Sequence, residues 1–237
     1  MIIREERIGG QRLILGDCLQ VMPLLGRSDA VVTDPPYGIS SHTPWRLRRL
    51  DYGEWDKETA TPTAIAMLVM CASVPSVIAW CDWRQLSALA NACPGRSERP
   101  LTWVKPNPPV LNGQRLFLSA TEHAFYGKLP GAWFSGGCVK SWWIGPPPPD
   151  RKHPTQKPDW LMSQCVQAIV PSGGTCLDPF MGSGTTLVAC QRLGRSGTGI
   201  EMDADYFDIA CKRVDEATRQ HDLFVAPPHP KPPSRSR

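Results

Sequence analysis

Short apolar runs alternate with amphipathic segments along most of this 237-residue chain. Apolar spacing predicts helices over 18–25, 63–71, 83–92, 159–169, 184–193 and 204–220, and strands over 12–15, 29–33, 76–80, 101–104, 122–126, 174–178 and 197–201. Strands that alternate with helices favour a mostly parallel sheet with helices on both faces, because parallel neighbours need a crossover connection. The sequence therefore predicts an α/β domain, and its length is enough to bury a substantial core.

The alternation breaks between Lys105 and Asp150, where proline, glycine and tryptophan gather. We interpret 105–150 as an inserted recognition element between two halves of one domain, 1–104 and 151–222. The tail over 223–237 is rich in proline and arginine. A segment of that composition lacks the apolar residues for a core, so the sequence predicts a disordered tail.

The composition excludes several classes of protein. The net charge of +4 permits a polyanionic partner without requiring one. The first residues are charged and no apolar run is long enough to span a membrane, so we expect a cytoplasmic protein without a membrane partner. The nine cysteines form no C-x-x-C pair and no cluster with zinc spacing, which predicts reduced thiols and no metal.

The first chemical motif is Asp34-Pro35-Pro36-Tyr37, directly after the strand predicted at 29–33. The two prolines lack N–H donors, so their carbonyl groups lie on a rigid turn and can only accept hydrogen bonds. An acid, rigid acceptors and an aromatic ring suit the binding of a planar group that carries an NH2. Taken alone, the same residues also fit an ordinary structural turn.

A second motif, Asp-Pro-Phe-Met-Gly-Ser-Gly-Thr-Thr, runs from Asp178 to Thr186 between a strand and a helix. A P-loop would have a lysine after the second glycine, and a dinucleotide turn would have a third glycine. Asp178 would repel a phosphate, and it favours an adenosyl ligand with a sulfonium and an ammonium group. Glu201 ends the next strand at the spacing of an acid that binds ribose hydroxyls. A glycine-rich turn without a ligand is the alternative.

Together with His153-Pro154-Thr155-Gln156-Lys157-Pro158, these motifs resemble those of the DNA amino-methyltransferases, in the order of the β group. The resemblance spans Leu13 to Val214. It implies a circularly permuted, Rossmann-like methyltransferase fold, with a seven-stranded, mostly parallel sheet, one antiparallel strand and an inserted target-recognition region. It also implies S-adenosylmethionine as the cofactor and an exocyclic amino group of a DNA base as the methyl acceptor.

The resemblance implies a role for each matching residue. The tetrad Asp34, Pro35, Pro36 and Tyr37 is catalytic: Asp34 and the Pro35 carbonyl bind the target NH2, and Tyr37 stacks on the base. The cofactor-binding residues are Asp17 and Cys18 for the adenine, Glu201 for the ribose, Asp178, Pro179, Phe180, Gly182, Ser183, Gly184 and Thr185 around the methionine, and His153, Thr155, Gln156 and Lys157 closing over it. None of the nine cysteines is needed as a nucleophile.

Asp34 favours the N6 group of adenine as the target, because family members with Ser in that place lean to cytosine. N4-cytosine methylation is the alternative. RNA or protein amide methylation fits less well, since amide methylators begin the tetrad with Asn. A catalytically silent DNA-binding module would have an altered tetrad or glycine motif, and both are intact.

The expected partner is double-stranded DNA, whose target base must leave the stack to reach such a site. The candidate DNA contacts are Arg46, Arg48 and Arg49 after the tetrad, and Arg115 and Lys140 in the recognition element. A solvated basic loop and a proline-rich structural insertion are the alternative interpretations of these two segments. The resemblance also implies a homodimer. No nuclease motif is evident, so the chain acts alone or as the modification half of a restriction–modification pair.

Overall fold

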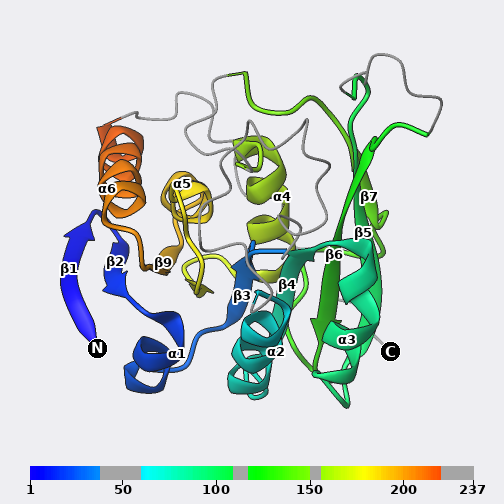
Figure 1. Cartoon of the computed structure of the whole chain (residues 1–237), viewed down its shortest axis with the longest axis horizontal. Coiled ribbons are helices and arrows are strands. Elements are labelled where there is room, and N and C mark those ends of the chain that lie inside the picture. Colours follow the sequence, from blue (N-terminus) through cyan, green and yellow to red (C-terminus); the bar gives the residue numbers. More distant parts are fainter. Residues whose placement is uncertain (38–59, 109–116, 150–155, 220–237) are drawn as a thin grey trace, which may run out of the picture.

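The computed structural model describes residues 1–37, 60–108, 117–149 and 156–219. In this part of the chain one sheet of nine strands has the order β1-β2-β9-β8-β3-β4-β6-β5-β7 (Figure 1). Its strands are β1 (Ile2–Ile8), β2 (Gln11–Gly16), β3 (Ala30–Thr33), β4 (Ser76–Cys81), β5 (Ser97–Val104), β6 (Thr121–Lys128), β7 (Trp142–Ile144), β8 (Thr175–Asp178) and β9 (Ser196–Glu201). The helices are α1 (Cys18–Val21), η1 (Met22–Leu24), α2 (Ala60–Met70), η2 (Trp83–Gln85), α3 (Leu86–Asn91), α4 (Asp159–Ile169), α5 (Thr185–Arg192) and α6 (Ala204–Arg219).

The sheet is mostly parallel, as the sequence predicts. Strands β2, β9, β8, β3 and β4 pair in parallel, while β6 is antiparallel to both β4 and β5. These strands from β2 to β5 are the expected seven with one antiparallel member. Two further strands extend the edges: β1 pairs antiparallel with β2, and β7 pairs in parallel with β5. Within the described ranges the sheet therefore has nine strands, and the expected number of seven is corrected.

Helices cover both faces of the sheet (Figure 1). Alternate residues of β3 point to opposite faces: Val31 packs in the cluster that contains α2 and α3, and Val32 packs in the cluster that contains α4. Helices α5 and α6 lie on the same face as α4 and cover β2, around Leu187 and Phe207. Burial on both faces explains why the central strands read as continuous apolar runs.

The segment over 105–150 does more than interrupt the fold. Its strand β6 lies in the interior of the sheet between β4 and β5, and β7 adds the edge strand. The expected insertion therefore contributes two strands to the sheet in its described part. The role of this segment in target recognition stays a prediction, and the predicted tail lies outside the described residues.

The described residues contain no helix long and apolar enough to cross a membrane. The same part of the chain contains no cluster of three or more His, Cys, Asp or Glu side chains that would hold a metal ion. All nine cysteines are free thiols, and seven are buried. Burial raises the pKa of Cys71 and of Cys165 to about 12, so these thiols are packing groups rather than nucleophiles.

Candidate active site

Acidic residues gather at the carboxyl edge of the sheet. Asp17 follows β2, Glu201 ends β9, Asp178 ends β8 and Asp34 follows β3, and these four strands are neighbours in the sheet. Parallel strands end at a common edge, which is where ligands bind in open α/β sheets. The structure therefore brings the tetrad and the glycine motif, which are far apart in the sequence, to one edge.

A hydrogen bond joins the two motifs. The hydroxyl of Thr33, the residue before the tetrad, donates to Asp178 Oδ1 over 2.7 Å. Strand pairing supports the same junction, because Val31 of β3 lies opposite Leu177 of β8. A ligand on the glycine motif and a ligand on the tetrad would consequently meet.

Asp178 is a buried acceptor with a shifted titration. Its side chain accepts hydrogen bonds from Thr186, Thr33 and the Phe180 N–H, and the residue is 3% exposed. Burial raises the pKa of Asp178 to about 6, with a smaller contribution from the nearby Asp34 charge, and the hydrogen bonds only partly offset that rise. A cationic group nearby would favour the ionised form.

Gly182 and Gly184 are glycines for different reasons. Gly182 has a φ of +49°, and a Cβ placed on it would meet no atom within 4 Å. Gly184 has a φ of +80°, but its Cβ would lie 2.9 Å from Ala210 Cβ on α6. Gly184 thus permits the close packing of two helices, whereas Gly182 leaves open space beside the turn, where a ligand can approach the backbone.

Glu201 fixes this turn to the end of β9. Its Oε2 accepts from the Gly182 N–H over 2.9 Å, and its Oε1 accepts from the N–H groups of Met202 and Asp203. Burial raises the pKa of Glu201, and these hydrogen bonds oppose the rise. An ionised carboxylate oxygen has about two lone pairs, so Oε2 keeps one for a further donor such as a ribose hydroxyl.

Arg213 is a structural support that the sequence analysis missed. Its guanidinium donates from α6 to the Ser183 carbonyl over 2.6 Å and to the hydroxyls of Ser183 and Thr185 over 3.0 Å, and it also pairs with Asp159 of α4. An arginine in a helical segment carries no signal of such a role. It holds the glycine turn against two helices.

Hydrogen bonds hold the tetrad after the end of β3. The Tyr37 hydroxyl donates to Asp34 Oδ1 over 2.7 Å, and the Gln85 amide donates to the Tyr37 carbonyl over 3.2 Å. Burial raises the pKa of Tyr37 well above its ordinary value, and the Asp34 charge adds to the rise. The Tyr37 hydroxyl is therefore protonated and remains a donor to Asp34 at physiological pH.

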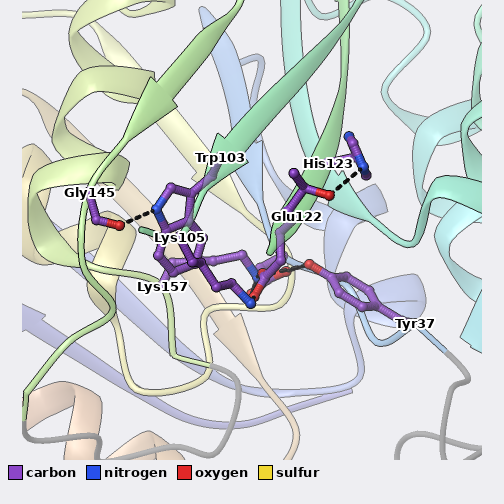
Figure 2. A network of polar contacts seen from close by, with 9 residues as sticks. Tyr37, Trp103, Lys105, Glu122, His123, Gly145 and Lys157 are labelled. Carbon is purple, nitrogen blue, oxygen red and sulfur yellow. Dashed lines mark hydrogen bonds and ion pairs between the residues drawn. The ribbon is translucent and has the colours of Figure 1, made fainter. Parts of the chain in front are cut away.

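A buried ammonium group joins the tetrad to the antiparallel strand (Figure 2). Lys157 Nζ lies 2.7 Å from Asp34 Oδ2 and 3.1 Å from Glu122 Oε2, and Lys105 pairs with the other oxygen of Glu122. Burial lowers the pKa of Lys157, but Asp34 and Glu122 outweigh it and raise that pKa overall. Burial opposes ionisation of Glu122, yet the two lysines lower its pKa to about 2. Lys157 and Glu122 are thus a charged pair.

The remaining expected site residues have varied surroundings. Asp17 caps α1 by accepting the Leu19 N–H, and Cys18 is buried beside it. Pro179 and Ser183 are buried in the glycine turn, and Gln156 is half-buried next to Lys157. Lys140 is exposed, with its ammonium 4.7 Å from the ring centre of Trp142 on the edge strand β7. His153, Thr155, Arg46, Arg48, Arg49 and Arg115 lie outside the described residues.

Glu122 and Lys105 are two further site residues that the sequence did not indicate. Lys105 follows β5, and Glu122 lies near the start of β6, so the antiparallel direction of β6 brings both to the same edge of the sheet. A charged residue at a strand terminus is common on protein surfaces and gives no signal by itself. Only the pairing of β5 with β6 reveals the contact.

Comparison with known proteins points to one family. The model of a DNA methylase family matches residues 131–212. M2.LlaDCHI, a Type II methyltransferase of Lactococcus lactis subsp. cremoris, is 28% identical over an alignment of 224 residues, and the match covers 79% of this chain and 82% of that protein. The solved M1.HpyAVI–SAM complex is 25% identical with a TM-score of 0.68, and the match covers 86% of this chain and 99% of that one.

A further solved structure shares the fold alone. The PvuII DNA methyltransferase, described as cytosine-N4-specific, has a TM-score of 0.70 at 13% identity, and the match covers 90% of each chain. The sheet order and these structural neighbours show a Rossmann-like methyltransferase fold. The matched family, relative and complex agree with that class, and together they support a DNA amino-methyltransferase of the N6/N4 family.

Proposed function

We propose that this N6/N4 DNA methyltransferase uses S-adenosylmethionine to methylate the N6 amino group of a flipped-out adenine in duplex DNA. The observation that carries the proposal is the junction of the two motifs, where the Thr33 hydroxyl bonds Asp178 and Asp34 follows directly. A methyl donor on one side and an amine on the other would meet at this junction.

The residues of the glycine turn fit the cofactor. Asp178 offers a buried carboxylate for an ammonium group, Gly182 leaves open space for a close approach, and Glu201 Oε2 keeps a free lone pair for a ribose hydroxyl. When bound, S-adenosylmethionine supplies a methyl group on a positively charged sulfur that leaves as a neutral thioether. Asp17 at the start of α1 is the proposed contact of the adenine ring.

The tetrad residues orient the target amine. An exocyclic amino group of a base is a poor nucleophile, because its lone pair is delocalised into the ring. Hydrogen bonds from this NH2 to the Asp34 carboxylate and the Pro35 carbonyl would localise the lone pair and aim it at the methyl group. As the new N–C bond forms, Asp34 stabilises the positive charge on the nitrogen and is the nearest base for the proton that the amine loses.

Asp34 supports adenine over cytosine as the target base. The proposal rests on the resemblance to family members in which the first tetrad residue accompanies the choice of base. Both bases present an exocyclic amine, so the geometry of the tetrad alone serves either one. Lys140, Arg46, Arg48, Arg49 and Arg115 remain the proposed contacts of the DNA, and the dimeric state remains a prediction.

Expression in a host that lacks base methylation tests the proposal directly. Single-molecule sequencing of the host DNA should detect N6-methyladenine at one recurrent sequence, and the Asp34→Ala variant should leave the DNA unmodified. Detection of N4-methylcytosine at a recurrent site would instead identify cytosine as the target base. DNA that is identical with and without the wild-type gene would refute methylation of DNA in that host.

We expect binding of S-adenosylmethionine to weaken in mildly acidic solution, because the pKa of Asp178 is raised to about 6. Below that pH the carboxyl is neutral and no longer attracts an ammonium group. Calorimetric titrations should show the affinity falling by up to tenfold for each unit of pH below about 6, and Asp178→Asn should bind weakly with a flat pH profile. An affinity that stays constant between about pH 8 and about pH 5 would contradict the assignment.

A further inference from the structure

Lys157 contacts the groups that the proposed function gives to the target base. Its ammonium lies 2.7 Å from Asp34 Oδ2 and 2.8 Å from the Tyr37 hydroxyl, and 5.2 Å from the centre of the Tyr37 ring. The resemblance implies that Lys157 closes over the cofactor. Its described contacts place the ammonium beside Asp34 and Tyr37, the residues proposed to bind the target base, rather than beside the glycine turn.

Glu122 gives this ammonium a second anionic partner (Figure 2). The Lys157 side chain is 2% exposed, and Glu122 Oε2 lies 3.1 Å from its nitrogen. The two carboxylates come from different strands, Asp34 from the end of β3 and Glu122 from the start of β6. A buried charge is costly when it loses its partner, and here one carboxylate remains when the other is engaged elsewhere.

The target amine and the Lys157 ammonium make the same kind of hydrogen bond. Both are N–H donors, and a carboxylate only accepts. Each Asp34 oxygen accepts one hydrogen bond, Oδ1 from the Tyr37 hydroxyl and Oδ2 from Lys157. A target amine that binds Oδ2 therefore meets the Lys157 ammonium there. A base that binds there displaces the ammonium or shares the oxygen with it.

We propose that Lys157 and Glu122 are positioning residues for methyl transfer: Lys157 orients the Asp34 carboxylate, and Glu122 holds the ammonium when the target amine binds Asp34 Oδ2. This inference rests on the proposed function, since it concerns the amine side of the same site. The charge of the site stays constant during the exchange, because the ammonium remains beside an anion.

The titratable groups that face Lys157 come from several elements. Asp34 and Tyr37 follow β3, Glu122 and its partner Lys105 come from β6 and the end of β5, Cys81 ends β4 and Cys165 lies on α4. Burial raises the pKa of the two thiols to about 12 and that of Tyr37 well above its ordinary value, so these three groups are neutral. Removing the Lys157 ammonium therefore leaves the carboxylates of Asp34 and Glu122 around its place. Of these two, Glu122 keeps Lys105 as an ion-pair partner.

The test uses Lys157→Met, Glu122→Gln and the double variant, with Lys212→Met as the control. Lys212 is exposed on α6, so its variant removes a positive charge of the same kind away from the site. Single-turnover methyl transfer to unmethylated duplex DNA and the affinity for S-adenosylmethionine are measured across pH. We expect Lys157→Met to lower the transfer rate about 100-fold and to leave the affinity largely unchanged.

The pH profile separates a positioning role from a purely structural one. In Lys157→Met, the Asp34 and Glu122 carboxylates lack the ammonium between them and should therefore share a proton up to a higher pH. The acid limb of the pH–rate profile should then move up by about one pH unit or more. The double variant removes one of these carboxylates and should return the acid limb towards the wild-type position. An acid limb that does not move in Lys157→Met, or a cofactor affinity that falls as much as the rate, would overturn the proposal.

A measurement without substrate decides the pairing independently. In protein with labelled lysine, the Lys157 signal is identified by its loss in Lys157→Met and is titrated by NMR. We expect it to titrate above the value of about 10.4 that is usual for a lysine, and to move down in Glu122→Gln. A signal indifferent to Glu122 would refute the pairing. A wild-type protein that transfers no methyl to DNA would refute the proposed function, and the titration would still test the pairing.

Discussion

Asp34→Ala should abolish methyl transfer, with a rate loss of about 1,000-fold or more, while binding of S-adenosylmethionine stays largely intact. The variant removes the acceptor that orients the target amine and stabilises its developing charge. It leaves the Thr33–Asp178 hydrogen bond and the glycine turn in place. The measurements are single-turnover transfer from labelled cofactor to unmethylated duplex DNA, and calorimetric binding of the cofactor alone.

The same strand provides a matched control for Asp34→Ala. Asp29 lies just before β3, at the opposite end from Asp34, and its carboxylate accepts from the Thr175 N–H over 2.7 Å. Asp29→Ala should cost about 1–3 kcal/mol of the free energy of unfolding and should keep the transfer rate. Wild-type transfer by a folded Asp34→Ala protein would remove Asp34 from its role.

Gly182→Val should prevent binding of S-adenosylmethionine. Gly182 has a φ of +49°, and its Cβ direction faces open space beside the turn. A valine would fill the space that the cofactor needs and would also strain the backbone, because a β-branched residue disfavours positive φ. We expect the cofactor affinity to fall at least about 100-fold, measured by calorimetry with the folded state checked by circular dichroism.

Gly173→Val separates the two effects of the substitution. Gly173 has a φ of +70° and no neighbour within 4 Å of its Cβ position, and it lies between α4 and β8 at the amino end of that strand. Valine there imposes a comparable backbone strain away from the cofactor turn. Unchanged cofactor affinity in Gly182→Val, or an equal loss in Gly173→Val, would refute the assignment of the turn.

The sequence predicts the elements that carry strong local signals. Helix α4 has the predicted bounds, Asp159–Ile169, because Pro158 precedes it and buried residues recur along one face. The predicted helix over 83–92 is divided into η2 and α3, since Asp82 and Gln85 form a capping box that favours a tight first turn. Strand β1 escapes prediction because its charged sequence is held by pairing with β2, which is not a local property.

The candidate site also contains residues whose positions the sequence predicts and residues whose positions it does not. The acids Asp34, Asp178 and Glu201 are predictable, since each ends a buried strand and parallel strands end at one edge. The position of the Lys157 ammonium is not, because it depends on Glu122, which only the sheet order brings near the tetrad. Local motifs thus indicate the kind of ligand, and the order of the strands decides which charges surround it.

The antiparallel direction of β6 has a consequence for how relatives of this chain can diverge. The chain leaves the sheet after Val104 and returns at Thr121, and the Lys105 N–H donates to the Ala120 carbonyl over 2.7 Å at the base of this excursion. With both ends tied at one point, doubling the length of the excursion costs only about 0.6 kcal/mol in loop closure. Glu122 comes soon after this closed segment. Relatives can therefore differ in the residues between Lys105 and Ala120 while the charged side chains near Asp34 keep their positions.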